Sequence, residues 1–138
     1  MFEEQFVRLP FAKKRLPVTV QIRRHRGIAS IGSWRPELKQ ELQEACFRSY
    51  QDKVKSIGRE GVPRIRRAAE VWRHIDIQQI VIDPTVDNRL LVYVVPDWDE
   101  SEHMEWCIQD GEVVYVGQFL GYPLESYCKD MPGNHASA

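Results

Sequence analysis

The sequence predicts an α+β fold: a mostly antiparallel sheet with one long helix packed on a face and a second, shorter helix. Three observations predict it. Apolar residues alternate in several short segments, an apolar stripe at helical spacing runs along residues 36–57, and an Asp110-Gly111 pair separates two strand-like runs. An apolar helix stripe and an apolar sheet face can bury each other, so we expect the two to pack together.

Six strands are expected, each a short run of apolar and β-branched residues bounded by turn-forming residues. They lie near residues 6–9, 18–23, 77–82, 90–95, 103–109 and 112–119. The last two form a hairpin, because Asp-Gly favours a two-residue type I′ turn. With that turn, Trp106 faces Tyr115 on the core side of the hairpin.

The long helix is expected between Ser33 and Ile57. Ser33 suits the N-cap, Pro36 suits the first turn, and Gly58 suits the position just after the end. Cys46 lies within the apolar stripe, which predicts a buried structural thiol. A shorter helix is expected over residues 64–75, with Trp72 as its anchor in the core.

The length of 138 residues fits one domain, expected over residues 1–127. The small and polar residues of 128–138 predict a flexible tail. Three cysteines without a C-x-x-C pair fit reduced thiols, hence a cytoplasmic protein. No apolar run reaches the ~18 residues that a membrane span needs, and we expect no membrane partner.

Charge is distributed unevenly along the chain. Residues 1–75 carry seventeen Lys and Arg against eight Asp and Glu, whereas residues 76–138 carry two against twelve. Either the two halves neutralise each other where they touch, or the surface has opposed poles that steer a charged partner. The basic run Arg23, Arg24 and Arg26 is an alternative partner surface. Nucleic acid is not expected, because no glycine-interleaved aromatic signature accompanies that run.

The search for catalytic motifs finds no phosphate-binding glycine loop and no H-E-x-x-H helix. The acidic loop at residues 97–103 contains carboxylates and a histidine, but the sixth and twelfth positions of a calcium loop hold Glu102 and Ile108. We therefore expect no metal, no cofactor and no catalytic residue. Three interpretations of the loop stay open: a structural turn with Trp98 packed and its carboxylates in water, a partner-binding site, or a catalytic or metal site.

The residues from Asp97 to His103, the hairpin after them, Val116-Gly117-Gln118-Phe119 and Tyr127 carry a family resemblance. Together they resemble a family of small uncharacterised bacterial α+β domains with an acidic-Trp-acidic loop ending in Glu-His. The resemblance covers residues 70–127, and Met104 departs from the glycine that the family has after the histidine. Such domains are similar to immunity proteins of polymorphic toxin systems.

The resemblance implies a cytoplasmic binding protein, not an enzyme, that neutralises a cognate protein toxin by direct contact. Trp98 is expected to be an exposed anchor, since aromatic side chains dominate many interfaces. The complete set of partner-binding residues is predicted to be Asp97, Trp98, Asp99, Glu100, Glu102 and His103. The alternative is a small enzyme or a metal-dependent protein that uses the acidic loop 97–103.

Overall fold

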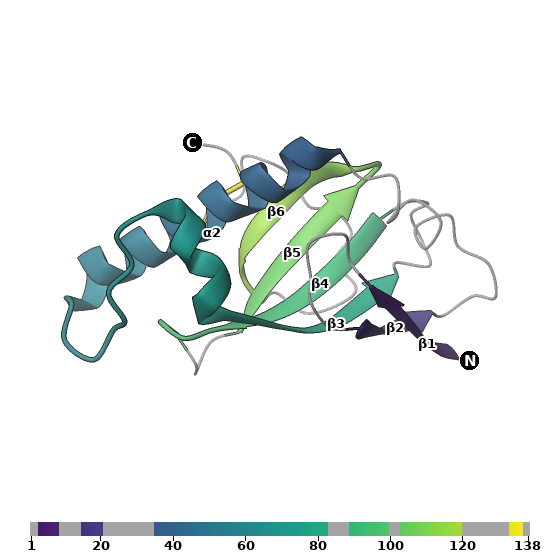
Figure 1. Ribbon diagram of the computed structural model, residues 1–138, viewed down its shortest axis with the longest axis horizontal. Helices are drawn as coiled ribbons and strands as arrows, with labels where there is room; N and C mark the ends of the chain where they lie inside the picture. Colours follow the sequence, from purple (N-terminus) through teal and green to yellow (C-terminus); the bar gives the residue numbers. More distant parts are fainter. Residues whose placement is uncertain are drawn as a thin grey trace.

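The computed structural model describes residues 3–8, 15–20, 35–82, 89–99, 103–119 and 133–136. Figure 1 shows a twisted sheet with one long helix laid across a face, so the predicted α+β class is confirmed. In chain order the elements are β1 (Glu3–Arg8), β2 (Arg15–Val20), α2 (Pro36–Ile57), the 3₁₀ helix η1 (Ala68–His74), β3 (Ile75–Ile82), β4 (Arg89–Pro96), β5 (Met104–Gln109) and β6 (Glu112–Gln118).

The six strands lie in the sheet in the order of the chain, from β1 to β6. Every neighbouring pair is antiparallel except β2 and β3, which are parallel. A parallel pair needs a long crossover connection, and α2 and η1 both lie in the chain between these two strands. The mostly antiparallel sheet predicted from the sequence is confirmed.

Helix α2 begins at Pro36 after an extended Arg35, with proline in the first turn as expected. The predicted N-cap, Ser33, lies outside the described residues. The helix ends at Gly58, whose φ of +84° is in the range that favours glycine, and whose N–H donates to Val54 O at 2.8 Å. Its buried stripe is Leu38, Leu42, Ala45, Cys46 and Tyr50.

The core lies between this stripe and one face of the sheet. Trp106 of β5 is fully buried there and meets Trp72 of η1 edge to face, with ring centroids 6.2 Å apart. Trp72 also donates its indole N–H to Gln43 Oε1 of α2 at 2.8 Å. Trp72 thus joins η1 to both the helix and the sheet, as predicted for an anchor.

The second, shorter helix is present as the 3₁₀ helix η1, but it begins at Ala68, so the start expected at residue 64 is wrong. The chain before Ala68 is not helical, because its backbone groups are bonded to side chains instead. Tyr50 Oη accepts the Ile65 N–H at 3.1 Å and donates to Pro63 O at 2.8 Å. Glu70 then accepts the Arg67 N–H at 3.0 Å and caps the 3₁₀ turn.

The hairpin turn is as predicted, but the register beyond it is not. Asp110 and Gly111 have φ values of +54° and +77°, as a type I′ turn requires. A bulge between Cys107 and Ile108 then changes the pairing, so that Cys107 faces Tyr115 and Trp106 faces Val116. The predicted pairing of Trp106 with Tyr115 is wrong, because the extra residue moves Tyr115 to the other face of the sheet. There it packs with Val81, Leu91 and Cys107.

Candidate functional site

The described part of the acidic loop is a turn after β4, held from both sides. The Asp97 N–H donates to His74 O at 2.7 Å, and the Asp97 carboxylate lies 3.1 Å from His74 Nδ1. Trp98 is only 4% exposed and packs edge-on against Tyr50, 5.7 Å between centroids. This burial corrects the expectation that Trp98 presents an exposed ring to a partner. The ring instead fixes the turn to α2.

The acidic groups of this turn are engaged within the protein. Asp99 Oδ2 lies 3.1 Å from Lys53 Nζ of α2, and only 14% of the Asp99 side chain is exposed. Asp97 keeps about half of its side chain in solvent. The burial of Asp99 therefore disagrees with the interpretation in which all the carboxylates of the loop stay in water. Two other predicted site residues, Glu100 and Glu102, lie outside the described residues, as do Arg23, Arg24 and Arg26.

His103, the last predicted residue of the loop, is exposed at the start of β5 and lines a hollow of about 290 Å³ with Trp98 and Asp99. The structure thus brings three of the predicted residues together. It adds polar residues of α2 and of the C-terminal segment that the sequence analysis did not single out: Ser49, Asp52, Lys53, Ser56 and His135. The hollow is a recess between helix, turn and sheet edge, and both polar and apolar residues line it.

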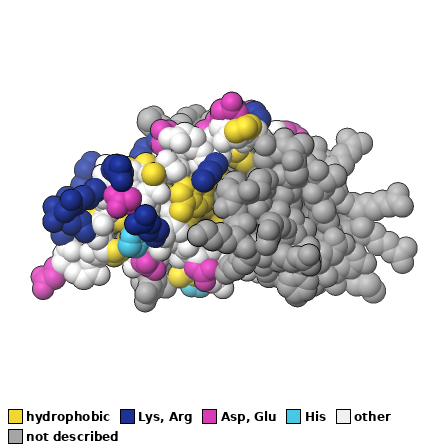
Figure 2. All heavy atoms as spheres, viewed as in Figure 1, with side chains coloured by type: hydrophobic (Ala, Val, Ile, Leu, Met, Phe, Trp, Pro, Cys, Tyr) yellow, Lys and Arg dark blue, Asp and Glu magenta, His cyan; other side chains and the backbone are white. Residues whose placement is uncertain are grey.

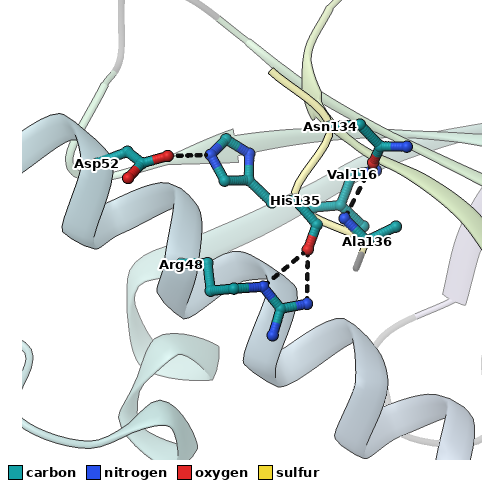
Figure 3. A network of polar contacts seen from close by, with 6 residues as sticks. All are labelled: Arg48, Asp52, Val116, Asn134, His135 and Ala136. Atoms are coloured by element: carbon teal, nitrogen blue, oxygen red, sulfur yellow. Dashed lines mark hydrogen bonds and ion pairs between the residues drawn. The ribbon is translucent and has the colours of Figure 1, made fainter. Parts of the chain in front are cut away.

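Residues 133–136 lie along β6, the last strand of the sheet (Figure 3). The His135 N–H donates to Val116 O at 2.7 Å. The Asn134 side chain accepts from the Val116 N–H at 3.0 Å and donates to Val114 O at 2.9 Å. These bonds cover backbone groups that an edge strand would leave open. Residues 133–136, part of the expected tail, thus lie bonded along β6.

The same segment is tied to α2. The Arg48 guanidinium donates to His135 O at 2.6 and 3.0 Å, and Asp52 Oδ2 lies 2.7 Å from His135 Nε2 (Figure 3). The sequence carries no spacing signal for this pair, because 83 residues separate Asp52 from His135. A Cβ at Gly117 would lie 2.6 Å from Gly133 O, so glycine at 117 permits the close approach.

Among the described residues, one buried thiol and two phenols have raised pKa values. Burial raises the pKa of the Cys46 thiol to about 12, and the thiol contacts Met104 Sδ at 3.8 Å. The predicted burial of Cys46 is confirmed. Burial, with the fully buried Glu105 second, raises the pKa of Tyr93 and of Tyr115 to about 12. A raised thiol pKa is the reverse of what a nucleophile needs.

Positive charge gathers at the C-terminal end of α2. Figure 2 shows Lys and Arg side chains clustered at the end of the molecule formed by the end of α2, the loop after it and η1. Between residues 55 and 73 there are six Lys and Arg against two Glu, a balance of +4. All six cationic residues are exposed: Lys55, Arg59, Arg64, Arg66, Arg67 and Arg73.

The described residues were searched for a metal site and for a membrane-spanning helix. Within them, no group of three or more His, Cys, Asp or Glu side chains is placed to hold a metal ion. In the same ranges, no helix is long and apolar enough to cross a membrane.

The chain was compared with known proteins. Residues 6–123 match the model of a family described as a domain of unknown function, DUF6985. The comparisons with curated proteins and with solved structures gave no match. The family match includes α2, the turn at 97–99 and the cationic end, and it stops before the segment at 133–136.

Proposed function

Because this chain belongs to DUF6985, a family of domains of unknown function, we propose a function from its own surface and from its resemblance to immunity proteins. It is a cytoplasmic binding protein that acts as an immunity protein and neutralises a cognate toxin by direct contact. One observation carries this proposal: charge is segregated on the folded protein, with six exposed cations at one end of α2.

Charge segregation suits a neutralising protein for a kinetic reason. An inhibitor must bind its toxin before the toxin acts, and complementary charge raises association rates by steering the encounter. Charge that is already paired inside the protein contributes little to such steering. The acidic turn is partly paired, through Asp97 with His74 and Asp99 with Lys53. The cationic end has more unpaired charge among the described residues, so it is the stronger candidate for the contact.

The experiment is to identify a toxin gene beside the gene of this protein, to co-express the pair, and to measure host growth and binding of the two purified proteins. We expect the parent chain to restore growth and to bind more slowly as salt is raised. Charge reversal at the acidic turn (Asp97→Lys) and at the cationic end (Arg59→Glu with Arg64→Glu) identifies the surface. If the parent neither binds the neighbouring gene product nor protects the host, the proposal fails.

The alternative function is a small enzyme or a metal-dependent protein that uses the loop at 97–103. The observation in its favour is that His103, Asp52 and His135 line one recess. An enzyme would lose turnover when His103 is changed to Ala, while a neutralising protein would protect the host as before. Loss of protection through His103→Ala, with an unchanged melting temperature and unchanged binding of the toxin, would favour the enzyme.

A further inference from the structure

A second hollow, of about 450 Å³, lies at the cationic end between the last turns of α2 and the chain from Arg59 to Arg66. We call it the cationic groove. Four of its lining residues are basic: Lys55, Arg59, Arg64 and Arg66. No Asp or Glu is among the lining residues. The groove therefore presents positive charge without a carboxylate of its own.

The four basic side chains are available for a ligand. All four residues are exposed, and none forms an ion pair with a carboxylate in the part of the chain that the structure describes. The nearest acidic neighbour in the sequence of Arg66 is Glu70, whose Oε1 accepts the backbone N–H groups of Arg66 and Arg67 at 3.3 and 3.0 Å. That carboxylate caps η1.

The floor of the groove is apolar. Phe47 and Val54 of α2 are half-buried there, and Tyr50 and Ile65 are buried beneath them. The Tyr50 hydroxyl holds the backbone on both sides of Arg64, through Pro63 O and the Ile65 N–H. A backbone held in this way limits the backbone entropy that the segment around Arg64 loses on binding.

We propose that the cationic groove binds an acidic segment of a protein partner, with carboxylates on the four cations and one apolar side chain on the floor. Arginine matches carboxylates through paired N–H donors, and three of the four cations are arginines. In naming the toxin as the owner of this segment, the inference rests on the proposed function.

Nucleic acid fits the groove less well. Proteins bind single strands by stacking bases on exposed aromatic rings. The two rings of the groove, Phe47 and Tyr50, are stacked on each other with centroids 6.1 Å apart, and Tyr50 is buried. An apolar floor between cations instead suits a peptide that alternates acidic and apolar side chains.

The test uses a fluorescein-labelled peptide of Glu and Asp with one central Leu, and the same peptide with Gln and Asn in their place. Fluorescence anisotropy should show binding of the acidic peptide only, weakened by salt. The variant Arg59→Glu with Arg64→Glu should lower its affinity about tenfold or more. A matched control, Arg67→Glu with Arg73→Glu, changes the net charge by the same amount at positions beside the groove. It should lower the affinity less than about threefold.

Circular dichroism melts establish that both variants fold. Equal loss in the two variants would show that the general field of this end binds the peptide, and the groove assignment would be overturned. Tighter binding of a single-stranded DNA oligonucleotide, lost in the groove variant, would overturn it in favour of nucleic acid. If the groove variant protects against the toxin as the parent does, the inference fails and the proposed function stands. If the parent itself binds no toxin, the proposed function fails, while the peptide result still decides what the groove binds.

Discussion

Removing the hydroxyl of Tyr50 should loosen the segment that carries Arg64. In the Tyr50→Phe variant two hydrogen bonds are lost, to Pro63 O at 2.8 Å and from the Ile65 N–H at 3.1 Å. Ile65 is only 4% exposed, so its N–H is left in an apolar environment without its acceptor. We expect the free energy of unfolding to fall by about 2–3 kcal/mol. For 138 residues, this lowers the melting temperature by about 7–10 °C.

Urea unfolding and thermal melts measure the loss, and amide hydrogen exchange at Ile65 locates it. A control is Tyr115→Phe, whose hydroxyl donates to Gln118 O at 2.7 Å on the other face of the sheet. It should lower stability while leaving exchange at Ile65 unchanged. The acidic peptide should bind Tyr50→Phe more weakly than Tyr115→Phe. An unchanged melting temperature together with unchanged exchange at Ile65 would refute the reasoning.

Three further predictions concern pH, metal and the C-terminal segment. Folding raises the pKa from 9.0 to about 12 for Cys46 and from 10.0 to about 12 for Tyr93 and Tyr115. Between these values, the folded state keeps protons that the unfolded state releases. The free energy of unfolding should therefore be independent of these groups below pH 9 and fall as pH rises toward 12, and urea titrations with no decline there would contradict this. Adding EDTA should leave the melting temperature unchanged; a drop of several degrees, reversed by one metal, would revive the metal-dependent alternative. Asn134→Ala removes the side-chain bonds to Val114 and Val116, so it should cost about 2 kcal/mol in urea unfolding, and a cost near zero would show that the segment is not held.

Sequence patterns correctly predicted the features that depend on residues close together in the chain. The stripe of α2, its end at Gly58 and the Asp110-Gly111 turn all follow from side chains a few residues apart, and all three are present. The bulge that moves Tyr115 to the other face depends on how β5 and β6 fit the sheet as a whole, so the alternation of apolar residues cannot reveal it.

The candidate sites were harder to predict, because they join distant parts of the chain. Trp98 and Asp99 stood out as an acidic aromatic loop, yet the partners that bury and pair them, Tyr50 and Lys53, come from α2. The basic residues after Gly58 gave no motif. They line a groove beside α2, where the Tyr50 hydroxyl bonds the chain at Pro63–Ile65.

The most direct test of neutralisation by binding is to identify a toxin encoded beside the gene of this protein and to measure the affinity of the purified pair. The account predicts that the parent binds and protects the host, that Arg59→Glu with Arg64→Glu weakens both about tenfold or more, and that Arg67→Glu with Arg73→Glu changes neither by more than about threefold. A parent chain with no measurable affinity for that toxin, in a host that it does not protect, would contradict the account.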